Sequence, residues 1–310
     1  MELLQGERKS NMKAAWLVCK LNYSHWRGNK RVLLSFLLAA VLCFLLTEKI
    51  MNYADAHGTI LMMLEPFIWS FEDGQSIMLS SLILVLLFAD MPFLDGSVPY
   101  YLIRITRRQW LTGQLMYVIS ATILYLIYIF LVTGLLCSRL AYPGNLWSNT
   151  AASLGYSGAG EVLQVPAVIA AMEMSTPYKC AWIIVGLMLG YTLMSVLFMF
   201  FINMKKGQMA AVFSVAGLHI YGEILNPNWF ISLLHLDIAH QNAARMICGW
   251  LSPIRQATFH SHNFGYDALP RLWHSLVFFL VIAVILIILL YYAIRRYNFY
   301  FIGTREETGK

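Results

Sequence analysis

The chain has 310 residues, of which 59% are hydrophobic and only 12% are charged. Soluble domains usually carry about 25% charged residues, so this composition and a mean hydropathy of +0.62 exclude an ordinary soluble globular protein. The formal net charge is +6, and the basic residues lie mostly outside the apolar runs. We therefore predict an all-α integral membrane protein.

Residues 12–30 predict an amphipathic helix before the first apolar run. Aromatic side chains and a cysteine share one face of this helix, and basic residues recur every seven positions along the flank. The face consists of Trp16, Cys19, Tyr23 and Trp26, and the flank of Lys13, Lys20 and Arg27. An aromatic face edged by basic residues suits a helix lying in the headgroup plane. We expect Trp16, Tyr23 and Trp26 to anchor it at the interface; a helix solvated in the cytoplasm is the alternative.

Six apolar runs are predicted to cross the membrane, because a crossing of the ~30 Å hydrocarbon core needs about 17–25 residues. The predicted spans are residues 32–51, 75–89, 115–137, 181–203, 208–224 and 274–294. The second and fifth are short. Between the fifth and sixth spans, a long segment of mixed polarity predicts short helices that are half-embedded in the membrane.

Most of the 22 Lys and Arg residues lie in the first 31 residues, the loop between spans two and three, the turn at Lys205–Lys206 and the tail. The acidic residues favour the opposite loops. By the positive-inside rule, both termini are expected to face the cytoplasm of a plasma-membrane protein. This orientation depends on residues 208–224 forming a full span.

The outer segments show no pattern of a metal or cofactor site. The acidic loop of residues 48–74, with Glu65 and Glu72, is expected to be solvated. Five histidines are expected at an aqueous rim, and they are His235, His240, His260, His262 and His274. Cys137 and Cys180 both lie near the outer face, but their positions do not establish a disulfide.

The loop between spans two and three is the most polar part of the middle of the chain. Burying one of its charges at the bilayer centre would cost roughly 2.5–3.5 kcal/mol, so it lies outside the hydrocarbon. Residues 95–109 predict a short helix with Ser97 as a plausible N-cap. Arg104, Arg107 and Arg108 are spaced to share one face of that helix, which suits docking of a soluble partner.

Two polar residues in the fifth span are candidates for a transport pathway. His219 and Glu223 are four positions apart and therefore share a helical face. An ionisable group within a span is a functional hypothesis in its own right. Both residues lie near the outer end of the span, so solvation by an outer vestibule is the alternative.

This arrangement resembles the ABC-2 type permeases, the membrane subunits of ATP-binding cassette exporters. The closest local match is ITRRQWLTGQL at residues 105–115, which is similar to the family's segment of a small polar residue, Arg, two residues, a bulky apolar residue, Leu and Gly-Lys before span three. Gln114 stands where lysine is usual. The resemblance implies that residues 95–109 are a coupling helix that inserts into a cleft on the ATPase. Its implied contact residues are Asp95, Tyr100, Tyr101, Arg104, Arg107 and Arg108.

The sequence contains no G-x-x-x-x-G-K-[ST] motif, and its cytoplasmic segments are too short for an ATPase domain. The resemblance therefore implies two separate ATPase subunits and a second permease subunit, as a homodimer or a paralogous heterodimer. It implies export more than uptake, without naming a substrate. No catalytic residue, cofactor or nucleic-acid partner is predicted. A secondary transporter, or a membrane enzyme or sensor without an ATPase, remains the alternative.

Overall fold

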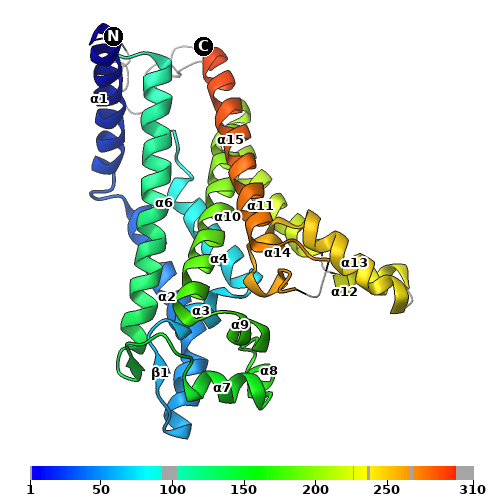
Figure 1. The fold of residues 1–310 in the computed structure, drawn as a ribbon. Coiled ribbons are helices and arrows are strands. Elements are labelled where there is room, and N and C mark those ends of the chain that lie inside the picture. The colour runs from blue at the N-terminus through cyan, green and yellow to red at the C-terminus, as the bar shows by residue number, and fades with distance from the viewer. Residues whose placement is uncertain are drawn as a thin grey trace, which may run out of the picture.

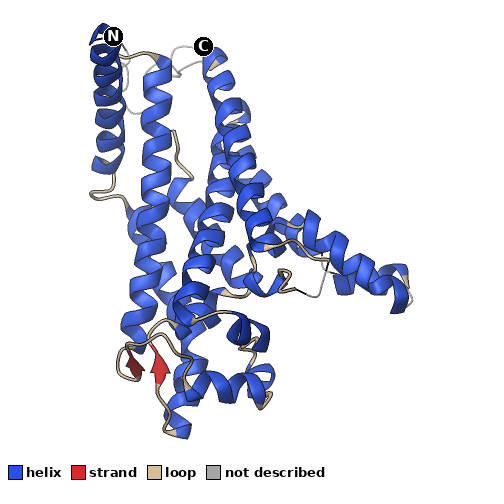
Figure 2. Ribbon diagram, viewed as in Figure 1, coloured by secondary structure: helices blue, strands red, loops and turns tan. Residues whose placement is uncertain are grey.

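The computed structural model describes residues 2–92, 103–165, 167–225, 227–235, 238–265 and 268–297. Helices make up most of these residues (Figures 1 and 2). The sheet within them is a parallel pair of two-residue strands, β1 (Leu61–Met62) and β2 (Ala141–Tyr142). The predicted all-α class is confirmed apart from this pair.

The described residues contain 4 helices that are long and apolar enough to cross a membrane alone. They are α2 (Lys30–His57), α6 (Arg107–Cys137), α10 (Pro177–Lys206) and α15 (Leu272–Arg296). Two bent pairs raise the number to as many as 6 if each pair is one span. A helix satisfies its own backbone hydrogen bonds, as a segment in hydrocarbon must. With several such apolar helices, the chain is a multi-pass membrane protein.

The first bent pair is α3 (Glu65–Phe71) with α4 (Gly74–Phe88), which meet at 88°. The bend follows from Asp73, because its carboxylate accepts hydrogen bonds from the backbone N–H groups of Gln75 (3.2 Å) and Ser76 (3.3 Å) and so starts a new helix. The second pair is α11 (Gln208–Ile224) with α12 (Pro227–Leu234), at 63°.

Short helices complete the fold. Three of them gather at one end of the bundle, and they are α7 (Asn149–Tyr156), α8 (Ala159–Leu163) and α9 (Ile169–Met174). Three others lie between α12 and α15, and they are α13 (Ile238–Leu251), α14 (Pro253–Ala257) and the 3-10 turn η1 (Phe259–Ser261). Helices α12 and α13 project sideways from the bundle (Figure 1). Short helices were expected in this segment.

Each predicted span coincides with a helix, although several helices run further than predicted. Helix α6 begins at Arg107 instead of residue 115, and α2 continues to His57 instead of residue 51. The length of an apolar run indicates only the part of a helix that is suited to hydrocarbon. The polar turns beyond it are set by capping residues, such as Gly58 at the end of α2 (φ +60°).

The N-terminal helix α1 (Glu2–Ser24) differs from the predicted helix of residues 12–30 at both ends. It ends at Ser24 because a turn follows, in which Gly28 has φ +80°. The side chain of Asn29 then accepts a hydrogen bond from the backbone N–H of Arg31 (3.0 Å) and starts α2. Figure 1 shows α1 running alongside the first turns of α6, not across the bundle.

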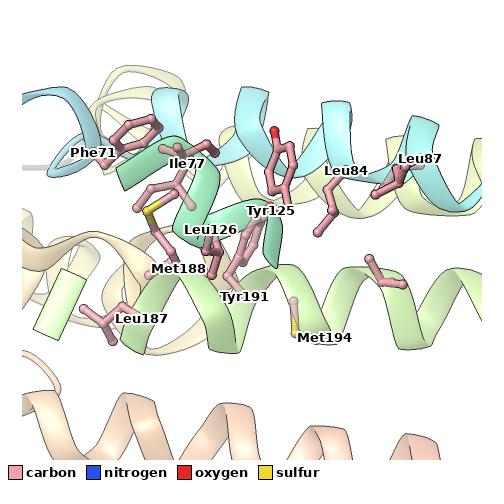
Figure 3. Packing of buried hydrophobic residues seen from close by; sticks show 14 of the residues in the cluster. Phe71, Ile77, Leu84, Leu87, Tyr125, Leu126, Leu187, Met188, Tyr191 and Met194 are labelled. Carbon is pink, nitrogen blue, oxygen red and sulfur yellow. The ribbon is translucent and has the colours of Figure 1, made fainter. Parts of the chain in front are cut away.

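Helix α10 is the centre of the packing, with α3, α4, α6, α11, α14 and α15 all in contact with it. Figure 3 shows Met188 and Tyr191 of α10 beside Leu126 of α6. Helix α15 approaches α10 closely at Gly190, where a β-carbon would lie 2.8 Å from the ring of Phe279. Small residues permit such approaches between membrane helices.

Candidate functional site

Both termini of the described chain lie at one end of the bundle, where α1 and α6 begin and α15 ends (Figure 1). We call this the basic end, after its arginines, which are Arg104, Arg107, Arg108, Arg295 and Arg296. The predicted coupling residues fall here in part. Asp95, Tyr100 and Tyr101 lie outside the described residues.

The prediction of one helix through residue 109 is wrong in its described part. Arg104 lies in a turn, whereas Arg107 and Arg108 begin α6. A new helix begins after Thr106. The Thr106 hydroxyl accepts a hydrogen bond from the backbone N–H of Gln109 (3.3 Å), and the Gln109 side chain accepts one from the backbone N–H of Thr106 (2.7 Å). The three arginines therefore do not share one helical face. This reciprocal pair is a capping box, and the T-x-x-Q spacing was the sequence signal for it.

Arg107 has a structural partner. Its guanidinium donates hydrogen bonds to the carbonyl oxygens of Arg295 (3.0 Å) and Ile294 (3.4 Å) in the last turn of α15. The last carbonyls of a helix have no partner within it, and basic side chains commonly satisfy them. Arg107 thus joins the start of α6 to the end of α15, although Arg104, Arg107 and Arg108 all have exposed side chains.

A groove of about 1020 Å³ opens between α1, α6 and α15 at the basic end. Its walls include the apolar side chains of Met12, Met116 and Ile294, and its rim carries Arg108 and Arg295. We call it the α1–α6–α15 groove. Below the rim, the hydroxyl groups of Thr112 and Tyr291 are hydrogen-bonded at 2.8 Å and link α6 to α15.

The predicted interfacial face of α1 is mostly turned toward α6. The Tyr23 hydroxyl is 2.8 Å from the Ser120 hydroxyl, and the Trp26 indole donates to the Tyr117 hydroxyl (2.8 Å). Trp16, in contrast, is 57% exposed. Tyr23 and Trp26 are therefore half-buried with their polar groups bonded to α6, and Trp16 keeps an exposed position. Anchoring of these residues at the membrane interface stays a prediction.

Gln114 explains why α1 stands along α6. It is fully buried, and its side-chain oxygen accepts a hydrogen bond from the amide of Asn22 at 2.8 Å. A buried amide without a partner is costly, so Gln114 favours a neighbour that supplies one. The sequence signal was an amide at the start of a span, yet nothing in the sequence pointed to Asn22 as its partner.

The two pathway candidates occupy different surroundings. His219 is buried, and its Nδ1 is 2.7 Å from the Tyr191 hydroxyl of α10. Glu223 lines a small pocket of about 130 Å³ together with Asp73, Arg255 and other residues near the bend between α3 and α4. His219 therefore ties α11 to α10, and Glu223 is the member that faces a cavity.

The acidic loop of residues 48–74 is not solvated throughout, contrary to expectation. Glu65 is fully buried and accepts hydrogen bonds from the backbone N–H of Met62 (3.0 Å), the backbone N–H of Ser148 (2.6 Å) and the Ser148 hydroxyl (2.6 Å). Glu72 is also fully buried, and neither of its carboxylate oxygens has a hydrogen-bond partner among the described residues. One partner of Glu65 is Met62, three residues before it, and the other is Ser148, 83 residues after it. The local sequence pattern therefore did not show that Glu65 is buried.

Two of the histidines expected at an aqueous rim have different surroundings: His262 belongs to the packing, whereas His260 is half-buried and lines the small pocket with Glu223. His262 is buried, with Nε2 2.8 Å from the Ser275 hydroxyl. Burial lowers the pKa of His260, and the Asp73 carboxylate and a hydrogen bond with the Glu72 backbone partly offset this effect. The ordinary pKa of histidine is about 6.5, and burial lowers the pKa of His260 further. We therefore expect His260 to be neutral at pH 7.

The described residues hold no group of three or more His, Cys, Asp or Glu side chains that could bind a metal ion. Cys137 and Cys180 are both buried and are not joined in a disulfide. Comparisons with protein-family models, curated proteins and solved structures found no match.

Proposed function

We propose that this chain is the membrane-spanning subunit of an ABC exporter, driven by a separate ATPase that docks at the basic end. The observation that carries the proposal is a pair of exposed arginines, Arg104 in the turn before α6 and Arg108 in the first turn of α6. Arg107 between them is bonded to the end of α15. A partner that moves this turn would therefore move α6 and α15 together, and α15 packs on the central helix α10.

The proposal includes six crossings with both termini in the cytoplasm. Helix α4 has 15 residues and α11 has 17, which at 1.5 Å per residue are about 22 and 25 Å long. Each is shorter than the ~30 Å core, and thinning of the bilayer accommodates such short spans at modest cost. In this arrangement α3, whose residues are all buried, lies toward the outer side of the membrane and is followed by the 88° bend into α4.

Cysteine labelling tests this topology. A cysteine in place of Gln208, which is exposed at the start of α11, is expected to react with a membrane-impermeant maleimide only from the cytoplasm. One in place of Asn263, after η1, is expected to react only from outside. The native cysteines are all buried, so the unsubstituted chain serves as the control. Reaction of both positions from the same side would mean that α11 does not cross.

Charge reversal at Arg104 and Arg108, in and beside the turn before α6, tests the proposed docking of the ATPase. Arg104→Glu combined with Arg108→Glu is expected to release the ATPase, because losing one side of a desolvated charged contact costs about 2–5 kcal/mol, or a factor of about 30 or more in affinity. The measurement is co-purification of a P-loop protein from native membranes, together with the ATP turnover of the complex. Arg107 is left intact because its replacement would disturb the contact with α15.

Arg296→Glu is the matched control, since Arg296 is an exposed arginine at the same end but outside the turn. It is expected to retain the ATPase. If the double reversal also retains it at the unsubstituted level, the turn is not the coupling element. If the unsubstituted chain co-purifies with no P-loop protein, the exporter proposal itself fails.

A further inference from the structure

The α1–α6–α15 groove has two kinds of lining. Its inner walls are apolar: Met12 and Met116 offer side-chain surface, whereas Ala15 and Ile294 are each only 1% exposed. Its rim carries the guanidinium groups of Arg108 and Arg295. Ligand pockets usually enclose roughly 300–1,000 Å³, so a groove of about 1020 Å³ has room for part of a lipid-sized molecule.

The rim charges are not neutralised by the described part of the chain. Among those residues, no carboxylate forms an ion pair with Arg108 or Arg295. The Arg295 guanidinium lies over the Tyr292 ring at 5.2 Å, which holds it in place and leaves its N–H groups available. The molecule that best fits this groove is therefore an anion with an apolar body.

The position of the groove indicates where such a molecule comes from. Helices α6 and α15 are both long and apolar enough to cross a membrane, and the arginines lie at their ends. Basic residues at the end of a span lie at the level of the lipid headgroups, so the apolar walls lie at the level of the acyl chains.

We propose that the α1–α6–α15 groove binds an anionic phospholipid of the surrounding bilayer. The phosphate accepts charge-assisted hydrogen bonds from Arg108 and Arg295, and an acyl chain lies against Met12 and Met116. A soluble acidic peptide would satisfy the rim and leave the apolar walls uncovered. The bound lipid fills the space between α1 and α15 beside the turn before α6. This inference does not depend on an ATPase partner.

Photo-crosslinking identifies the occupant directly. A benzophenone amino acid in place of Met116, activated in intact membranes, is expected to give an adduct with the mass of a phospholipid. The same residue in place of Leu135, which is exposed on α6 far from the groove, reports background capture of bulk lipid. An adduct with a peptide, whether from residues 298–310 of this chain or from another protein, would overturn the proposal.

Arginine replacement tests the headgroup contact. In the purified chain without any partner protein, Arg108→Gln combined with Arg295→Gln is expected to weaken binding of fluorescent phosphatidylglycerol about 25-fold. Each basic residue near an anionic surface contributes about fivefold. Phosphatidylcholine is expected to bind more weakly than phosphatidylglycerol and to respond little to the replacement.

Arg104→Gln is the matched control, because Arg104 is exposed at the same end and does not line the groove. It is expected to leave phosphatidylglycerol binding unchanged. An unaltered melting temperature of the double variant shows that the fold is intact. Equal binding of the two lipids, or an equal effect of the Arg104 control and the double variant, would overturn the proposal.

Discussion

Replacing Glu65 with alanine is expected to lower the free energy of unfolding by at least about 3 kcal/mol. The buried carboxylate receives three hydrogen bonds, two from backbone N–H groups and one from the Ser148 hydroxyl. Alanine leaves these donors buried without an acceptor, and each unsatisfied donor costs about 1–3 kcal/mol. The contact also fixes α3 against the segment that begins α7, so its loss is expected to loosen that end of the bundle first.

Tryptophan fluorescence during thermal unfolding measures this effect. Trp69 of α3 and Trp147, next to Ser148, are stacked at 5.3 Å between ring centroids, so their emission reports separation of the two segments. Ser148→Ala removes one of the three bonds and also the N-cap of α7, in which the hydroxyl accepts from the Ala151 N–H (3.1 Å), so it is expected to cost about 1.5–3 kcal/mol. Glu48→Ala is the control, because Glu48 is an exposed glutamate in α2. Equal stability of the Glu65 and Glu48 variants would contradict a structural role for the Glu65 carboxylate.

Two glycine-to-alanine replacements in α6 are expected to have opposite signs. At Gly113, a β-carbon would lie 2.6 Å from the Ala15 carbonyl oxygen and 2.6 Å from the Val18 β-carbon, both of which belong to α1. These atoms cannot move aside without displacing α1, so Gly113→Ala is expected to destabilise the α1–α6 contact by about 1–3 kcal/mol. At Gly134, the nearest atom is the end of the flexible Met63 side chain, at 3.6 Å. Gly134→Ala is therefore expected to stabilise the protein by about 0.5–1 kcal/mol, since alanine is the better helix former.

Limited trypsin digestion distinguishes the two replacements. The cleavage sites at Lys13 and Lys20 lie in α1, and cleavage there requires local unfolding of the helix. Cleavage is expected to be faster in Gly113→Ala than in the unsubstituted chain, and no faster in Gly134→Ala. Similar rates in both variants would show that α1 is not held by close packing at Gly113.

Helix α1 shows what the spacing of aromatic residues can and cannot predict. The pattern of Trp16, Cys19, Tyr23 and Trp26 correctly indicated a helix, although Trp26 lies in the turn after it and Trp16 is exposed whereas Cys19 is buried. It did not reveal what these side chains contact, because lipid headgroups and a neighbouring helix both accept an aromatic surface with polar tips. Ser120 and Gln114 of α6 decide the matter, since they supply the partners for Tyr23 and Asn22.

The sequence by itself determined the class of protein and the position of the long helices. Apolar runs of sufficient length have one stable form in hydrocarbon, a helix whose backbone groups bond to one another. That local rule located α2, α6, α10 and α15 without knowledge of their neighbours. Capping residues that are adjacent in sequence, such as Asp73 before α4 and Thr106 before α6, set where helices begin.

Only the tertiary structure decided which polar residues are free for function and which hold the fold together. Arg107 bonds a carbonyl 187 residues further along the chain, and Glu65 bonds Ser148 at a separation of 83 residues. Arg108, next to Arg107 in the sequence, also lines the groove but makes no such bond to α15 among the described residues. Such pairings depend on how whole helices pack, so neighbouring residues of the same type acquire different roles that no local pattern distinguishes.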